Sequence, residues 1–425
     1  MSLHHIFALL CLVLLPFAEF HLLKVGFNLS PPNAAAALFA VLILYWGITH
    51  PKNWLMPSYG ILSCLGAFIM LVVGGNLYHL PLKQALSAST PCIGAGLLFF
   101  VAFTVASHIH KSHWEAAILA STLLPPIIGL GHIFGIVPYF EPLSTLTSNK
   151  SFELFGVIHN GATGLMKSRG SYGISGIVGL AIGMRWILHH NPLKRLAGVF
   201  SSLVIVTGLI MSLSRSTWVA TLIFYASLAV LFGLFRILTK NPKKRGIHPG
   251  IILCSILAVA LLGTFLLWPV IQEANNRLIA MSPKTVQTRI KSYRLALDVI
   301  SDHPLIGLGP KFEHNVLHVK HIVHNTFLRV AASYGSMAAV TLSAFIIWTY
   351  GNLVTGLIKT EDRKRRYYLI IWIAAMTGAM VEMNLFSGEF SKQFWALAGL
   401  ASAEYHPNNS QAHERTALIE GSLSS

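Results

Sequence analysis

Long apolar runs, separated by short polar segments, make up most of the chain. A helix needs about 20 apolar residues to cross the hydrocarbon core of a bilayer. Runs of about this length lie near residues 5–23, 33–49, 58–75, 91–107, 115–136, 171–189, 195–213, 216–238, 249–269, 336–358, 367–384 and 390–404. The pattern therefore predicts an all-α polytopic membrane protein with about twelve transmembrane helices.

These spans divide the chain into six parts. Spans one to five occupy residues 1–136, a loop follows over 137–170, spans six to nine occupy 171–269, a second loop covers 270–335, spans ten to twelve occupy 336–404, and a polar tail that we expect to be disordered covers 405–425. Both loops are too long to be simple turns. The second is the main candidate for a folded region outside the bilayer.

An amphipathic helix is predicted within this second loop. Its apolar residues recur at spacings of four, three, four and three, at Val286, Ile290, Tyr293, Leu297 and Ile300. We expect this stripe to lie against the membrane helices or the membrane interface. On a helical wheel Arg289 falls beside the stripe, whereas Lys291 and Asp298 point away from it.

Turn-forming residues end that helix. Asp302-His303-Pro304 is followed by Gly307 and Gly309-Pro310, which predicts a rigid turn. A second, shorter helix is predicted from Asn325 to Tyr334, with Gly335 at its C-terminal cap.

Composition and charge agree with a membrane protein. Hydrophobic residues make up 54% of the chain and charged residues only 11%, against about 25% charged in a soluble domain. This excludes a cytosolic enzyme. The net charge of +16 comes from 31 Lys and Arg against 15 Asp and Glu. The basic residues lie in short clusters between apolar runs, a distribution that does not indicate nucleic-acid binding. Positive loops are retained in the cytoplasm, so the clusters near Lys52, Lys111, Lys194, Lys243 and Lys364 predict that both termini are cytoplasmic and both long loops are outside.

Metal and cofactor sites are not predicted. Cys11, Cys64, Cys92 and Cys254 all lie within apolar runs, where they act as small hydrophobes. Four histidines in the second loop, at 314, 318, 321 and 324, have suggestive spacing, but no HExxH motif or cysteine pair completes a zinc site. The outer loops are poor in the carboxylates that magnesium needs, and no phosphate-binding glycine loop is present.

Arg215 and His324 are the main candidates for chemistry. Arg215 lies in a very short break between two apolar runs, where it either anchors a lipid phosphate or binds an anionic substrate group. His324 immediately precedes the predicted helix cap. The positive end of a helix dipole disfavours the imidazolium, so this histidine is either a neutral general base or a structural hydrogen-bond donor. Together with the basic second loop, these residues suit a substrate that carries phosphates and a lipid tail.

Four motifs occur in an order that resembles the O-antigen ligase and polymerase superfamily of bacterial envelopes. They are Ser212-Leu-Ser-Arg215, Arg289 with Tyr293-Arg-Leu, His303-Pro-Leu-Ile-Gly-Leu-Gly-Pro310-Lys-Phe, and His324-Asn-Thr-Phe-Leu with Gly335. Arg169-Gly-Ser-Tyr-Gly173 is similar to the family's loop before the sixth span, although Ile-Ser-Gly follows here where the family often has Asn-Pro. The likeness covers roughly residues 150 to 385.

The resemblance implies a GT-C-like glycosyltransferase of the bacterial inner membrane, with its active site facing the periplasm. It would transfer a glycan from undecaprenyl pyrophosphate to a hydroxyl of the lipid A-core, with inversion and without metal or cofactor. The family's essential arginines map onto Arg215 and Arg289, and its essential histidine onto His324. Arg169, Arg294, His321 and Asn325 are the candidate substrate-binding residues.

Other functions stay open at this point. Polymerase and protein O-oligosaccharyltransferase relatives use the same type of donor with a different acceptor. A transporter of lipid-linked oligosaccharide would also be polytopic, but ionisable residues along a path through mid-membrane would be expected of it. A membrane scaffold without activity would not need Arg289 beside an apolar stripe.

Overall fold

A computed structural model describes residues 3–15, 23–24, 28–29, 31–49, 57–109, 111–133, 136, 151–154, 157–160, 169–187, 189–212, 218, 221, 224, 283–318, 323, 325–360 and 389–403. Over these ranges the protein is almost entirely helical. The helices are α1 (Leu3–Val13), α2 (Pro31–Thr49), α3 (Tyr59–His79), α4 (Leu82–His108), α5 (Lys111–Ile133), α7 (Arg169–Ile187), α8 (Pro192–Met211), α12 (Pro283–Asp302), α13 (Phe312–Asn315), α14 (Thr326–Tyr334), α15 (Ser336–Thr360) and α17 (Glu389–Ala403).

Four helices in the described ranges are long and apolar enough to cross a membrane: Tyr59–His79, Leu82–Ala106, Ser112–Gly131 and Pro192–Met211. Shorter apolar helices occupy Pro31–Leu42, Ser175–Ile187 and Ser336–Thr349. These elements agree with a multi-pass membrane protein. The predicted spans at 249–269 and 367–384, the predicted tail, and all of the span at 216–238 except residues 218, 221 and 224 lie outside the described residues, so the number twelve stays a prediction.

The first predicted span, 5–23, is too long. Helix α1 ends at Val13, and Leu23 lies instead in strand β1 (Leu23–Lys24), which pairs antiparallel with β2 (Asn28–Leu29). Pro16 accounts for the early end, because proline lacks the N–H that a helix interior needs and restricts the residue before it. A second antiparallel hairpin, β3 (Ser151–Leu154) and β4 (Val157–Asn160), lies within the long loop predicted over 137–170.

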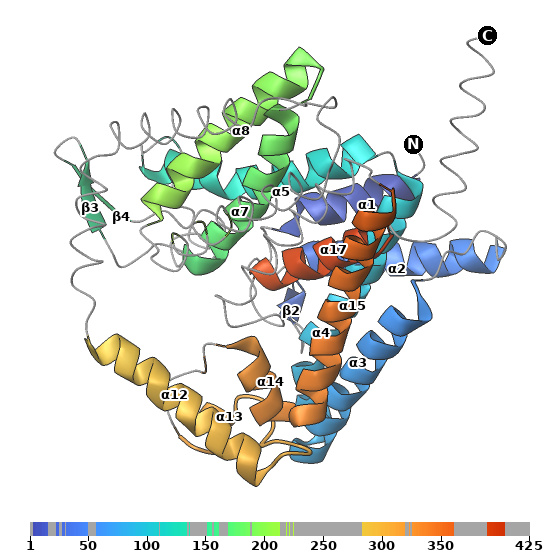
Figure 1. Ribbon diagram of the computed structural model, residues 1–425, viewed down its shortest axis with the longest axis vertical. Helices are drawn as coiled ribbons and strands as arrows, with labels where there is room; N and C mark the ends of the chain where they lie inside the picture. The colour runs from blue at the N-terminus through green and yellow to red at the C-terminus, as the bar shows by residue number, and fades with distance from the viewer. Residues whose placement is uncertain are drawn as a thin grey trace.

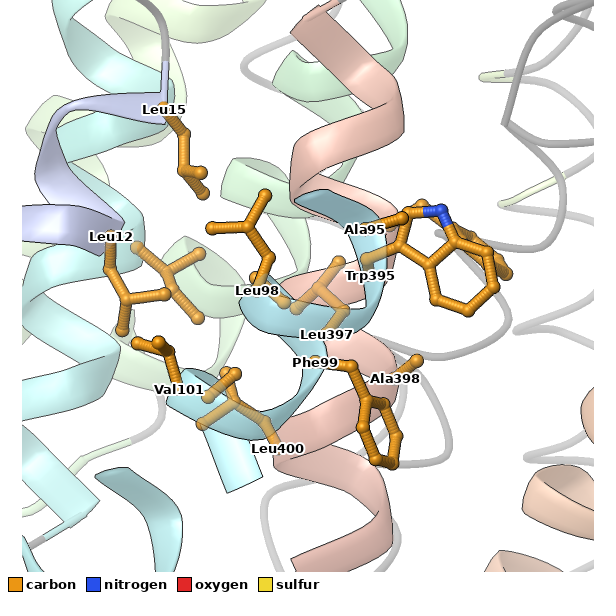
Figure 2. Close-up of a cluster of buried hydrophobic side chains, with 14 of the residues drawn as sticks. Leu12, Leu15, Ala95, Leu98, Phe99, Val101, Trp395, Leu397, Ala398 and Leu400 are labelled. Carbon is orange, nitrogen blue, oxygen red and sulfur yellow. The ribbon is translucent and has the colours of Figure 1, made fainter. Parts of the chain in front are cut away.

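Helices distant in the sequence pair in the membrane region (Figure 1). α17 packs against α4, α15 runs along α3, and α5 contacts both α7 and α8. The core where α4 meets α1 and α17 is filled by Leu12, Leu98, Val101, Leu397 and Leu400 (Figure 2). Beside them the Phe345 ring of α15 lies 5.7 Å from the ring of Phe99 and 5.4 Å from the ring of Trp395, measured between centroids. These contacts fix α15, and with it the segment that precedes α15.

Helices α7 and α8 approach closely because glycines face each other. A Cβ built on Gly198 would lie 2.7 Å from the carbonyl oxygen of Gly183, and a Cβ on Gly183 would lie 2.6 Å from Ser202 Oγ. Small residues of this kind allow helix backbones to pack tightly in membranes.

Helices α12, α13 and α14 form a separate group at one end of the molecule (Figure 1). α14 contacts α12 on one side and both α3 and α15 on the other. We call this group, residues 283–318 with 323 and 325–335, the outer subdomain. It contains or adjoins most of the candidate site residues.

Candidate functional site

The candidate residues differ in how far the structure describes them. Arg215, His321 and His324 lie outside the described residues. Arg289 lies in the first half of α12 and Arg169 is the first residue of α7, with side chains outside the described part. Arg294 is exposed on α12, and Asn325 is the N-cap of α14. Because α12 packs on α14, the structure brings the helix of Arg289 beside the helix that His324 precedes.

The outer subdomain has a small core of its own. Its buried residues are Ala296, Val299, Phe312, Val323 and Ala332. Tyr293, Ile300, Leu308, Leu317 and Leu328 pack around them. Val323, which directly precedes His324, is fully buried in this core. The chain next to the candidate base is therefore anchored by hydrophobic packing.

The face of α12 that packs is not the predicted stripe. Ser292, Ala296 and Val299 are buried, whereas Ile290 and Leu297 are 47% and 54% exposed. Among the stripe residues whose side chains the structure describes, Tyr293 and Ile300, at the stripe's edge, are the ones that contact the core. The physical reason is the contact with α14, because Ala296 and Val299 share a core with Ala332 and Leu328 of that helix. Lys291 and Asp298 are exposed, as the helical wheel predicted.

The glycine-rich turn after α12 is bonded to the end of α14. The N–H groups of Leu308 and Gly309 donate to the carbonyl oxygens of Ala332 and Ser333, each at 2.9 Å, and Ser336 N–H donates to Pro304 O at 2.7 Å. Gly307 and Gly335 adopt φ values of 69° and 88°, which favour glycine. A Cβ on Gly335 would overlap the Leu305 carbonyl. The predicted rigid turn is confirmed, and it holds the α14–α15 junction.

Helix α14 begins and ends as predicted. Asn325 has extended backbone angles, and its Oδ1 accepts a hydrogen bond from the Leu328 N–H at 3.1 Å. Gly335 is the C-cap. His324, which lies outside the described residues, directly precedes this N-cap in the sequence.

A buried carboxylate, which the sequence did not single out as functional, lies beside this segment. Glu313 of α13 is only 1% exposed, and its Oε1 lies 3.3 Å from the Nε of Arg329. The same oxygen accepts a hydrogen bond from the Val323 N–H at 3.3 Å. The only available signal was an acidic residue in a basic loop, which does not indicate burial.

The outer subdomain packs against α3 through α14. The ring of Tyr334 packs on Gly75, and the Asn76 side chain forms a hydrogen bond with Tyr334 and donates to Ser89 Oγ at 3.0 Å. Burial raises the pKa of Tyr334 to about 12. This phenol therefore stays protonated at neutral pH and does not serve as a base there.

A second buried ion pair lies away from the outer subdomain. Glu115 of α5, 3% exposed, binds Arg185 of α7 and accepts a hydrogen bond from Trp186 Nε1 at 3.3 Å. Both charges lie within predicted spans, where an ionisable residue is costly unless paired. The pair ties α5 to α7.

Metal ligands do not gather in the part of the chain that the structure describes, where no group of three or more His, Cys, Asp or Glu side chains could hold an ion. His314 and His318 are both exposed.

Comparison with known families matches residues 200–343 to the family described as O-antigen ligase. The matched segment contains Arg215, Arg289, His324 and the whole outer subdomain, and it excludes α1 to α7. This confirms the resemblance to the O-antigen ligase superfamily, whose members are glycosyltransferase-like ligases or polymerases. No curated protein matches the chain.

Proposed function

We propose that this protein is an O-antigen ligase. It transfers a glycan from undecaprenyl pyrophosphate to a hydroxyl of the lipid A-core, at the periplasmic face of the bacterial inner membrane, with both termini in the cytoplasm. The observation that carries the proposal is the family match over residues 200–343, because this segment includes the three candidate catalytic residues. The structure supports it by packing α12, which contains Arg289, against α14, which His324 precedes.

The proposed reaction is a single displacement without metal. His324 takes the proton of the acceptor hydroxyl while its oxygen attacks the anomeric carbon and the bond from that carbon to the pyrophosphate oxygen breaks. The bonding electrons leave with the pyrophosphate, and the configuration at the anomeric carbon inverts. Arg215 and Arg289 bind the pyrophosphate and stabilise the charge that develops on it. Arg169, Arg294, His321 and Asn325 are proposed to bind the substrates.

Transfer by the purified protein in lipid vesicles tests this mechanism. The vesicles contain an undecaprenyl-pyrophosphate-linked glycan and lipid A-core. We expect Arg215→Ala, Arg289→Ala and His324→Ala to abolish transfer while the protein still inserts into the membrane. Lys291→Ala, on the exposed face of α12, is the matched control and should stay active. An active His324→Ala protein would exclude His324 as the base.

The acceptor is tested separately, in a strain that lacks the protein. Loss of all glycan-capped core, with accumulation of lipid-linked polymer, indicates a ligase. Core that carries a single repeat indicates a polymerase, and an unchanged lipopolysaccharide with unglycosylated protein indicates a protein O-oligosaccharyltransferase. Loss of glycan-capped core with the lipid-linked glycan retained in the cytoplasmic leaflet indicates a transporter.

A further inference from the structure

We propose that Glu313 is a positioning residue for the proposed base His324, acting through the backbone on which His324 lies. The inference rests on the proposed function, because it takes His324 as the group that receives the acceptor proton. It adds a residue that the motif resemblance does not assign.

The contacts of Glu313 reach the chain on both sides of position 324, at Val323 and at Arg329. Glu313 Oε1 accepts the Val323 N–H and pairs with Arg329 Nε, both at 3.3 Å. The backbone N–H of Arg329 donates in turn to the Asn325 carbonyl at 3.0 Å. The residues on both sides of His324 are therefore tied, directly or through Arg329, to one carboxylate.

Because Glu313 and Val323 are buried, the loss of either contact is costly. Glu313 is 1% exposed and Val323 is 0% exposed, so water does not replace a lost partner. A buried carboxylate is costly unless it is paired and hydrogen-bonded. If residue 313 only had to accept the Val323 N–H, a neutral amide oxygen would suffice, without the cost of a buried charge. The ion pair adds a second tie, from α13 to the first half of α14.

Packing alone does not account for this arrangement, because Phe312 already anchors α13 in the core of the outer subdomain. Glu313 adds a directional constraint on the 323–325 backbone. A general base must lie within hydrogen-bond reach of the proton it takes. Misplacement of a reacting group by about 1 Å costs on the order of 100-fold in rate.

Steady-state transfer kinetics test the proposal. Glu313→Ala loses both ties, and we expect kcat to fall on the order of 100-fold while KM for the lipid-linked donor stays unchanged, since the arginines bind it. Glu313→Gln keeps an acceptor for the Val323 N–H and should recover at least roughly tenfold of that loss.

Two control variants separate positioning from stability. Glu115→Ala breaks the other buried ion pair, so it should lower the thermal midpoint and leave kcat per folded molecule unchanged. Asp298→Ala removes an exposed carboxylate of the outer subdomain and should change neither. An unchanged kcat or a raised donor KM in Glu313→Ala would overturn the positioning role. Full activity of His324→Ala alone would instead overturn the proposed function.

Discussion

The ring of Tyr334, the last residue of α14, packs directly on Gly75 of α3, where a Cβ would lie 3.2 Å from the Tyr334 Cδ1 atom. This contact joins the outer subdomain to a helix long enough to cross the membrane. The end of α14 opposite the proposed base is thus fixed to the membrane region.

Because of Tyr334, the stability of the protein is expected to fall as the pH rises in the alkaline range. Burial raises its pKa from 10.0 to about 12, so between these values the folded protein holds a proton that the unfolded chain has lost. The stabilising contribution is complete below pH 10 and is lost as the pH rises toward 12. We expect the thermal midpoint of the native protein to fall over this window more steeply than that of Tyr334→Phe. Equal slopes in detergent solution would contradict the assignment.

Gly335 is the glycine most sensitive to substitution at the junction of α14 and α15. Its φ is 88°, and an added Cβ would overlap the Leu305 carbonyl. We expect Gly335→Ala to lower the free energy of unfolding by more than about 1 kcal/mol and to lower transfer activity. Gly351→Ala is the matched control, because a Cβ at that helical position of α15 meets open space. It should leave stability unchanged or raise it by about 0.5–1 kcal/mol.

Two substitutions of Asn325 distinguish its role as a helix cap from its proposed role in substrate binding. Its Oδ1 caps α14 through the Leu328 N–H, so Asn325→Ala should cost about 1 kcal/mol of stability. Asn325→Ser retains a capping oxygen and should restore most of that loss. If Asn325 also binds substrate through its amide, Asn325→Ser will regain stability but keep a raised KM. If Asn325→Ser recovers both the stability and the KM of the native protein, the role of Asn325 is capping alone. The thermal midpoint and KM are measured on the same preparations.

Arg289 should not tolerate lysine. A guanidinium binds two phosphate oxygens through a planar fork, whereas an ammonium acts as a point charge. We expect Arg289→Lys and Arg215→Lys to lower kcat by roughly 100-fold to 1000-fold. Lys291→Arg, the reverse change at an exposed position of α12, should leave kcat unchanged. Near-native activity of Arg289→Lys would argue against two-point phosphate binding at that residue.

Several elements of the fold could be predicted because their causes are local. The apolar length of α3 and α8 meets the thickness of a bilayer, and Asn325 and Gly335 have the chemistry of helix caps. The glycines at 307 and 309 indicated the turn that the structure contains. Each of these features is determined by residues close together in the sequence, so the sequence is sufficient to predict it.

The packed face of α12 could not be predicted in this way. Periodicity pointed to the large apolar residues Ile290 and Leu297, but both are exposed. The face that packs contains Ser292, Ala296 and Val299, and the last two share a core with Ala332 of α14. The buried face therefore depends on where α14 lies, which no pattern within α12 encodes.

The sequence by itself determined that this is an apolar, many-helix chain with a basic loop region and an ordered set of motifs, because hydropathy, caps and motif order are properties of neighbouring residues. Only the tertiary structure decided that α17 packs on α4, that Glu115 meets Arg185, and that Glu313 binds both Val323 and Arg329. Such pairings depend on shape and charge complementarity between segments far apart in the chain. They become visible when the helices are brought together in space.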